Sequence, residues 1–210
     1  MSKSLLLLGA RGMGKVVLEA LEGQNIFTEI ALLDTNANYN TLFSYPILGK
    51  CDEMEKYKGK YTHAFVSIGD NEVRTAYLQR LIDLGFEIPT IIHPRAYISK
   101  SASLGIGVFV NVNAIINASC KIGNGCVINS GAIVEHDNQL GECVHMCPNS
   151  TTTGDVIIGD KVFVGAGSCI INGIQIGSNV VIAAGSTVIS NFPDNVMVAG
   201  NPAVIKKHRT

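Results

Sequence analysis

Apolar residues recur at every sixth position through the second half of the chain. From Leu104 to Val188, fifteen successive positions at this spacing hold fourteen apolar residues, and the exception is Thr152. A helix repeats its faces every 3.6 residues and a strand every two, so neither produces this spacing. The pattern therefore predicts a repeat of short strands separated by corners. The apolar positions are Leu104, Val110, Ile116, Ile122, Ile128, Val134, Leu140, Met146, Ile158, Val164, Ile170, Ile176, Ile182 and Val188.

A second period, of eighteen residues, is superimposed on the first. At every third repeat a glycine follows the apolar residue, as in Leu104-Gly105 and Ile122-Gly123. Three residues after each apolar position the chain favours Gly, Asn and Asp, which tolerate the positive φ of tight corners. These corner residues are Gly107, Asn113, Gly125, Gly131, Asp137, Asn149, Asp155, Gly167, Gly173, Asn179, Gly185 and Asn191. Three repeats therefore form one turn of a triangular parallel β-helix with the apolar column inside.

The first half of the chain alternates apolar runs with helical patterns, which indicates a small parallel α/β domain of the Rossmann-like type. The sequence predicts strands over 4–8, 29–33, 64–68 and 88–92, and helices over 15–22 and 72–84. His93-Pro94 marks the change from one pattern to the other. We therefore expect two domains, residues 1–93 and residues 94–210.

Three successive strands of the first domain end in residues typical of a ligand crevice. The first strand runs into Gly9-Ala10-Arg11-Gly12-Met13-Gly14, the second ends at Asp34, and the third is followed by Gly69. Glycines let backbone N–H groups approach a phosphate, and an acidic residue at the next strand end can bind a ribose hydroxyl. The glycine spacing differs from the dinucleotide motif, so a tight turn without a ligand remains an alternative.

Charge and composition exclude several classes of protein. A formal net charge of −1 argues against a general nucleic-acid binder, which needs a basic field. No apolar run approaches the ~20 residues of a membrane span, and residues 5–8 are too short for the core of a signal peptide. The six cysteines are not spaced as a metal site: Cys143-x-His145-x-Cys147 lacks a second close pair, and Cys120 and Cys126 fall in an inward column. We expect a cytoplasmic protein with reduced thiols and no bound metal.

The polar exceptions to the repeat gather near one corner, and such departures mark functional sites. Thr152 interrupts the apolar column, Asn138 is the one amide in an inward column, and Glu135-His136-Asp137 places a histidine between two carboxylates. A carboxylate next to a histidine fixes its tautomer and favours the imidazolium, as a general base requires. An exposed polar corner without chemistry is the alternative.

These features resemble one known family. The repeat, the Glu135-His136-Asp137 corner, the Ala199-Gly200-Asn201-Pro202-Ala203 tail and the Gly-rich front domain are similar to bacterial sugar acyltransferases with a left-handed β-helix (hexapeptide repeats). The group includes UDP-4-amino-sugar N-acetyltransferases of the bacillosamine type and sialic acid O-acetyltransferases. The left-handed sense of the coil is taken from this resemblance alone.

The resemblance implies a homotrimer that binds acetyl-CoA in the groove between neighbouring prisms and a nucleotide-sugar in the front domain. It implies that His136 is the base and that Asp137 raises its basicity. Its implied contacts to acetyl-CoA are His145, Gly154, Ala166 and Ala184, and its implied contacts to the nucleotide-sugar are Arg11, Gly12, Met13, Asp34, Thr35 and Gly69. Members of the group usually have histidine where this chain has Met13, which leaves the identity of the sugar open.

We therefore expect direct transfer of an acetyl group from acetyl-CoA to the amino group of a nucleotide-linked sugar, a step of surface-polysaccharide or glycan biosynthesis. O-acetylation of a sugar hydroxyl, including that of sialic acid, uses the same base and donor and remains an alternative. A trimeric metal hydratase on the same prism is a more remote one, because it needs three histidine ligands and the repeat holds only His136 and His145. A non-catalytic scaffold would leave the cluster of polar exceptions without an explanation.

Overall fold

A computed structural model describes residues 3–36 and 38–209 of the chain. The chain divides into two compact units, Met1–Ile91 and Ile92–Thr210, each with its own core. Among the described residues, no helix has both the length and the apolar character that crossing a membrane requires.

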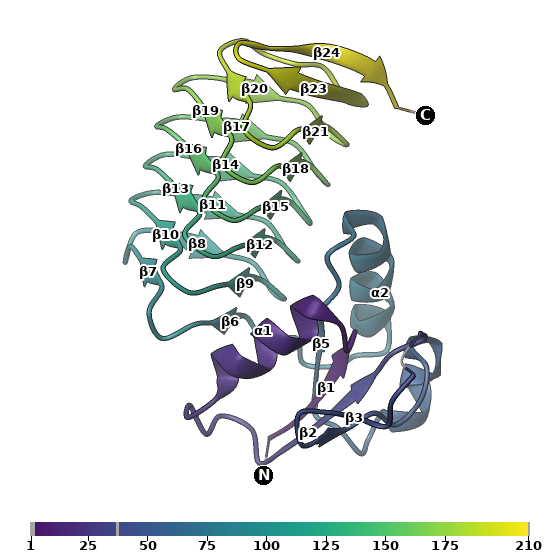
Figure 1. The fold of residues 1–210 in the computed structure, drawn as a ribbon. Coiled ribbons are helices and arrows are strands. Elements are labelled where there is room, and N and C mark those ends of the chain that lie inside the picture. Colours follow the sequence, from purple (N-terminus) through teal and green to yellow (C-terminus); the bar gives the residue numbers. More distant parts are fainter. Residues whose placement is uncertain (1–2, 37, 210) are drawn as a thin grey trace. The chain divides into compact units, whose positions relative to one another are not determined.

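The first unit is built on a three-stranded parallel sheet (Figure 1). β1 (Ser4–Leu8) lies between β2 (Glu29–Leu33) and β5 (His63–Val66), and all five residues of β1 are buried. Helix α1 (Gly12–Leu21) follows β1, and α2 (Asn71–Asp83) follows β5. The Asp70 side chain caps α2 by accepting a hydrogen bond from the Val73 N–H. Between β2 and β5 lie a hairpin, β3 (Thr41–Leu42) and β4 (Tyr45–Pro46), and a 3₁₀ helix, η1 (Cys51–Tyr57).

The fourth strand predicted over residues 88–92 is wrong for this sheet. Beyond β5, only an isolated bridge joins His63 to Glu87 among the described residues. Pro89 follows two residues later and has no N–H to donate, so the ladder cannot extend. Ile91–Ile92 instead forms β6, which pairs with β9 in a sheet of the repeat. The predicted start of α1 is also late, because the helix begins inside the glycine turn at Gly12.

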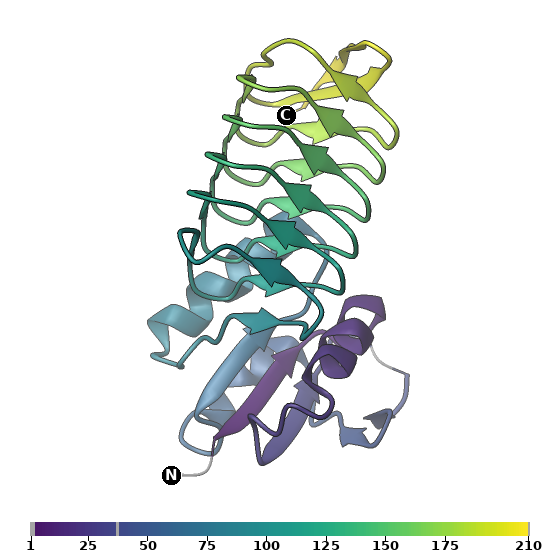
Figure 2. The same ribbon diagram turned by 90° about the vertical axis from the view of Figure 1, so that its left-hand side faces the viewer.

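The second unit is a three-sided prism of parallel two-residue strands (Figures 1 and 2). We name its faces after the strands nearest the polar corner. The β13 face holds β7 (Tyr97–Ile98), β10 (Ile115–Ile116), β13 (Ile133–Val134), β16 (Thr151–Thr152), β19 (Cys169–Ile170) and β22 (Thr187–Val188). The β14 face holds β8 (Ser103–Leu104), β11 (Lys121–Ile122), β14 (Gln139–Leu140), β17 (Ile157–Ile158) and β20 (Gln175–Ile176).

The third face, named the β15 face, continues into the C-terminal hairpin. It holds β6, β9 (Phe109–Val110), β12 (Val127–Ile128), β15 (His145–Met146), β18 (Phe163–Val164) and β21 (Val181–Ile182). β23 (Val196–Gly200) pairs with β21, and β24 (Ala203–His208) pairs antiparallel with β23. The hairpin therefore covers the last coil on this face.

The apolar column predicted from the sequence forms the core of the prism. Val110, Ile128, Val134 and Ile182 are fully buried, and each strand pairs with the strand eighteen residues away, as Val134 does with Thr152. The glycine column stacks along one edge: a Cβ on Gly123 would lie 2.4 Å from the Gly141 carbonyl oxygen. Only glycine permits this approach, which explains the eighteen-residue period.

The corners adopt the left-handed backbone conformation at every sixth residue from Gly107 to Gly185. The predicted corner residues follow this rule except Asn191, which lies beyond the regular repeat. The prediction also omitted three corners, because Ser119, Cys143 and Lys161 have positive φ without being Gly, Asn or Asp. The stacked coils impose the conformation there against the local preference of the side chains.

Candidate functional site

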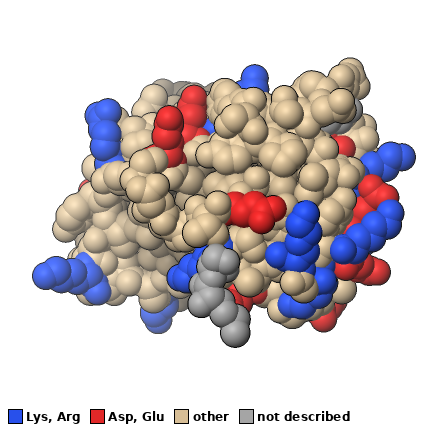
Figure 3. Space-filling view, turned by 90° about the horizontal axis from the view of Figure 1, so that it is seen from below, with Lys and Arg blue, Asp and Glu red and all other residues tan. Residues whose placement is uncertain are grey.

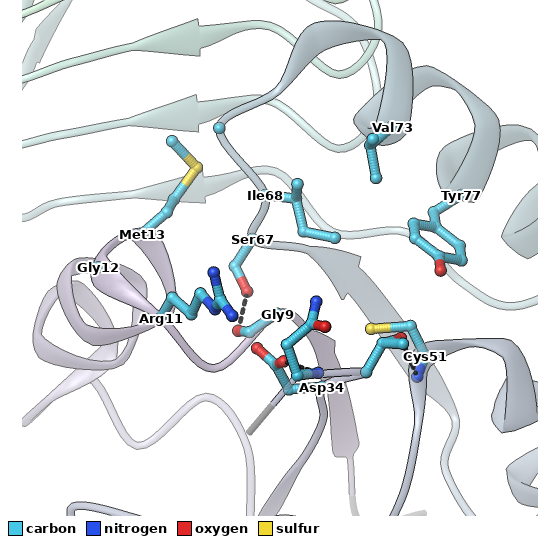
Figure 4. A pocket seen from close by; sticks show the side chains of 13 residues that line it. Gly9, Arg11, Gly12, Met13, Asp34, Cys51, Ser67, Ile68, Val73 and Tyr77 are labelled. Carbon is cyan, nitrogen blue, oxygen red and sulfur yellow. Dashed lines mark hydrogen bonds between the residues drawn. The ribbon is translucent and has the colours of Figure 1, made fainter. Parts of the chain in front are cut away.

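A cavity of about 600 Å³ opens at the carboxyl ends of the strands of the first unit (Figure 4). The structure brings together around it all six residues that the resemblance implied as contacts to a nucleotide-sugar. These are Arg11, Gly12, Met13, Asp34, Thr35 and Gly69. In Figure 4, Arg11 and Met13 lie on one side of the cavity, and Cys51 and Tyr77 lie on the other.

The glycine turn shapes the floor of this cavity. Gly9 has φ +107°, and a Cβ there would lie 2.7 Å from the Ser67 carbonyl oxygen. The Ser67 hydroxyl donates to the Leu8 and Gly9 carbonyl oxygens, the latter at 2.7 Å. Glycine at position 9 therefore allows the β1–α1 turn to lie directly against the end of β5.

Asp34 holds the same turn from the other side. One of its carboxylate oxygens accepts from the Ala10 N–H at 2.7 Å, and the other accepts from the Asn36 N–H at 2.7 Å. The side chain is nearly buried, at 9% exposure. The Asp34 carboxylate thus orders the crevice through two backbone N–H groups and also lines the cavity.

Four apolar or weakly polar residues of the cavity wall were not predicted: Cys51, Ile68, Val73 and Tyr77. Cys51 comes from η1, whose place beside β2 has no signal in the sequence. Val73 and Tyr77 lie on α2, where their spacing indicates only a helix face. Burial raises the pKa of the Cys51 thiol and of the Tyr77 hydroxyl, so both are neutral at pH 7.

The second cluster lies in the prism, at the corner between β13 and β14. The His136 Nδ1 and the Asp137 carboxylate are 2.8 Å apart, and both side chains are more than half exposed. A carboxylate only accepts hydrogen bonds, so Nδ1 carries the proton and Nε2 presents its lone pair. Asp137 has φ +62°, which is the corner conformation that brings its carboxylate to the ring.

Gly154 lies one coil further along, directly against the imidazole. A Cβ at position 154 would lie 2.5 Å from His136 Cε1 and 2.7 Å from Nε2. Any larger residue would push the ring away. The structure thus places His136, Asp137 and Gly154 together, and the absence of a side chain at 154 makes room for the imidazole.

Charge around this corner favours the imidazolium. The hydrogen bond to Asp137 raises the pKa of His136 above its ordinary value, and the charges of Asp137, Glu135 and Asp155 act in the same direction. Partial desolvation of the ring acts in the opposite direction and is second in size to the hydrogen bond to Asp137. Chemically, this arrangement can accept a proton at Nε2 and stabilise the resulting charge through Nδ1.

Thr152 and Asn138, the two polar exceptions in the inward columns, make hydrogen bonds in different parts of the prism. Thr152 is fully buried, pairs with Val134, and directs its hydroxyl to the Ile133 carbonyl oxygen at 3.5 Å. Its hydroxyl therefore makes a contact within the β13 face. Asn138 is also fully buried, and its amide bonds to the backbone of the corner that carries His136.

The residues implied to bind acetyl-CoA are divided among different parts of the prism. His145 lies on the β15 face, 6% exposed, with Nε2 3.3 Å from the Asn129 amide and its ring edge-to-face with Phe163. Ala166 and Ala184 follow β18 and β21 at the corner between the β15 and β13 faces, where the Ala166 carbonyl accepts from the Gly185 N–H. Gly154 follows β16 at the next corner. A single chain therefore brings only Gly154 of this set to His136.

The part of the chain that the structure describes carries histidines, cysteines and carboxylates in both units. No group of three or more His, Cys, Asp or Glu side chains there is arranged to hold a metal ion. Figure 3 shows one face of the molecule, on which Lys and Arg side chains are interspersed with Asp and Glu. This mixture agrees with the net charge of −1.

Residues 4–81 match the PglD N-terminal domain family, and residues 155–190 match the hexapeptide repeat of succinyl-transferase. No significant match was found among curated protein sequences.

Solved structures match over nearly the whole chain. A mutant of perosamine N-acetyltransferase from Caulobacter crescentus, in complex with CoA and GDP-perosamine, is 34% identical with a TM-score of 0.93, and 97% of each chain is covered. The acetyltransferase domain of PglB from Neisseria gonorrhoeae, in complex with acetyl coenzyme A, is 31% identical with a TM-score of 0.93, covering 98% of this chain and 100% of that one.

Proposed function

Because this chain belongs to the left-handed β-helix sugar acyltransferases with a PglD-type N-terminal domain, we propose that it acetylates the amino group of a nucleotide-linked amino sugar with acetyl-CoA. The observation that carries the proposal is the His136–Asp137 pair at 2.8 Å, with Gly154 packed against the imidazole ring. Two members of the family with this architecture are N-acetyltransferases or acetyltransferases solved with CoA or acetyl-CoA.

The cavity of the first unit is proposed to hold the nucleotide-sugar. The support is its volume of about 600 Å³ and its Gly-rich floor at the start of α1, where backbone N–H groups and the helix dipole favour phosphate. Arg11 adds a positive charge to the wall. Gly12, Met13, Asp34, Thr35 and Gly69 complete the proposed contacts.

In the proposed reaction the sugar amine attacks the thioester carbonyl carbon of acetyl-CoA. A C–N bond forms, His136 Nε2 accepts a proton from the amine, and Asp137 stabilises the imidazolium through Nδ1. The Gly154 N–H is a proposed donor to the thioester oxyanion. The C–S bond then breaks, and the proton on His136 neutralises the CoA thiolate, which restores the base.

We propose a homotrimer in which acetyl-CoA lies between neighbouring prisms. The support is the distribution of the implied acetyl-CoA contacts within one chain. Ala166 and Ala184 lie at a different corner from His136, and His145 lies on the β15 face. A neighbouring prism that presents its own corner to His136 brings the two sets together.

All six cysteines are free thiols, which supports a cytoplasmic location.

UDP-linked 4-amino sugars of the bacillosamine type are the proposed substrate class, and O-acetylation of a sugar hydroxyl, including sialic acid, is the alternative. A thiol-release assay across UDP- and GDP-linked amino sugars and free sialic acid distinguishes them. Transfer to an amine supports the proposal, and transfer only to hydroxyl acceptors contradicts it.

The central experiment is His136→Ala. Removal of a general base lowers turnover by about 10²–10⁴, so kcat for thiol release should fall by that factor, with the melting temperature unchanged because the side chain is exposed. His208→Ala, at another exposed histidine in β24, is the matched control and should retain full kcat. A kcat for His136→Ala within twofold of the wild-type value would remove His136 from the mechanism.

A further inference from the structure

Asn138 is an amide in a column where amides are not expected. The column faces the interior of the prism just before the strands of the β14 face, and its other members are Ala102, Cys120, Val156 and Ile174. Asn138 is 0% exposed. Burying an amide is unfavourable unless its hydrogen-bonding groups are satisfied, so the partners of this side chain reveal its role.

The amide connects two superimposed corners of the prism. Its Nδ2 donates to the Glu135 carbonyl oxygen, immediately before His136, and to the Thr153 carbonyl oxygen at 2.9 Å, immediately before Gly154. Its Oδ1 accepts from the Val156 N–H at 3.1 Å, two residues after Gly154. One side chain is therefore bonded on both sides of Gly154 and to the peptide that leads into His136.

The distance between the two corners matters for the proposed chemistry, because the His136 ring lies in van der Waals contact with the Gly154 backbone. Backbone hydrogen bonds also join these corners, such as that from the Asp155 N–H to the His136 carbonyl at 3.0 Å. They fix the spacing of the coils in general. Only the Asn138 amide, within the described residues, ties the peptides on both sides of Gly154 to the peptide before His136.

We propose that Asn138 is a positioning residue for acyl transfer: it fixes the His136 ring relative to the Gly154 N–H, so that proton acceptor and oxyanion donor keep a productive separation. This inference rests on the proposed function. Misplacement by about 1 Å can cost about a hundredfold in rate, which is the scale on which such a residue acts.

Neighbouring residues of the column show which replacements fit. Cys120, eighteen residues earlier, donates its thiol at 2.9 Å to the Glu135 carbonyl, fifteen residues further along, so by the same repeat a cysteine at position 138 would reach the Thr153 carbonyl. Leucine has the branched shape of asparagine at a larger volume, but it makes no hydrogen bond. Asn138→Leu thus removes the connection, and Asn138→Cys retains one part of it.

The experiment compares Asn138→Leu, Asn138→Cys and Val108→Ala. Val108 is equally buried in an inward column of the β15 face and lies more than one eighteen-residue coil before either corner, so it controls for loss of stability. We expect Asn138→Leu to lower kcat at least tenfold, with the KM values for acetyl-CoA and nucleotide-sugar within about twofold. Asn138→Cys should recover most of kcat, and Val108→Ala should lower the melting temperature while keeping kcat.

A second readout does not depend on the reaction. The ¹⁵N chemical shifts of the His136 imidazole, followed against pH by NMR without substrates, report its tautomer and its hydrogen bond to Asp137. Glu135, Asp137 and Asp155 are the charged groups around this ring. We expect Asn138→Leu to alter this titration and Val108→Ala to leave it unchanged.

Two results would overturn the inference: wild-type kcat and an unchanged His136 titration in folded Asn138→Leu, or a loss of kcat that follows the melting temperature equally in Asn138→Leu and Val108→Ala. Failure of the proposed function is recognised separately, because His136→Ala would then retain its activity whatever the Asn138 variants do.

Discussion

Asp137 meets two demands at once. Its backbone takes the left-handed conformation that the corner requires, with φ +62°, and its carboxylate bonds to His136 Nδ1 at 2.8 Å. Asn and Asp are the side chains other than glycine that adopt this conformation most readily. Asp137→Asn therefore keeps the corner and removes the charge, which isolates the electrostatic contribution of the carboxylate.

We predict that Asp137→Asn lowers the pKa of His136. The hydrogen bond to Asp137 is the largest cause of the raised pKa, and the neutral amide stabilises the imidazolium less. The neutral base form then persists to lower pH, yet kcat at its plateau falls because the imidazolium formed during transfer is less stable. NMR titration of His136 and the pH profile of kcat measure the two effects. An unchanged His136 titration would show that Asp137 does not control the basicity of the ring.

At the scale of elements, the β1–α1 turn determines the form of the cavity. The turn approaches the end of β5 so closely that a side chain at Gly9 has no space, and α1 starts only three residues later at Gly12. The Asp34 bond to the Ala10 N–H joins the same turn to β2. Three strand ends and one helix start are thus held together by close backbone packing and by the side chains of Asp34 and Ser67.

We predict that Gly9→Ala destabilises the first unit by about 1–3 kcal/mol, the usual cost of a strained backbone, and weakens nucleotide-sugar affinity. The reasons are its φ of +107° and the 2.7 Å approach of the new Cβ to the Ser67 carbonyl oxygen. Gly23→Ala is the matched control: its φ is +75° and its Cβ would meet no atom within 4 Å. Chemical denaturation and calorimetric binding measure both. Equal losses in the two variants would show that the Ser67 contact is unimportant.

An element could be predicted from the sequence where it depends on local residues, and could not where it depends on contacts with other parts of the chain. The prism strands and most corners follow from the sequence because each coil repeats the same local requirements. The strand over 88–92 failed because one proline blocks the ladder, and Ser119, Cys143 and Lys161 turn corners that neighbouring coils impose.

The residues of the two candidate sites also fall into a predictable and an unpredictable group. The glycine turn, Asp34 and the His136 corner are visible as motifs, and Gly154 entered only through the resemblance. Cys51, Val73 and Tyr77 reach the cavity through the packing of η1 and α2, which no local pattern records.

At the scale of the whole molecule, the proposed trimer predicts complementation between variants. Chains with His136→Ala keep His145, and chains with His145→Ala keep His136, so neither trimer alone has a complete site if both residues are needed. Random mixing should restore about one quarter of the wild-type kcat, because one interface in four then joins an intact His136 to an intact His145. Thiol release after co-refolding measures it. No gain over either parent would place His145 in the site of its own chain.

The regular pairing of residues eighteen apart has a consequence for how such chains change length. A whole coil can be inserted or lost among residues 98–116 without altering any side chain between Val134 and Val156, because each coil only repeats the surface on which the next one rests. A change of one residue, by contrast, turns the inward columns outward along every later strand. Variation in length near the start of the prism should therefore come in multiples of eighteen residues, and it should leave the corner of His136 and Gly154 unchanged.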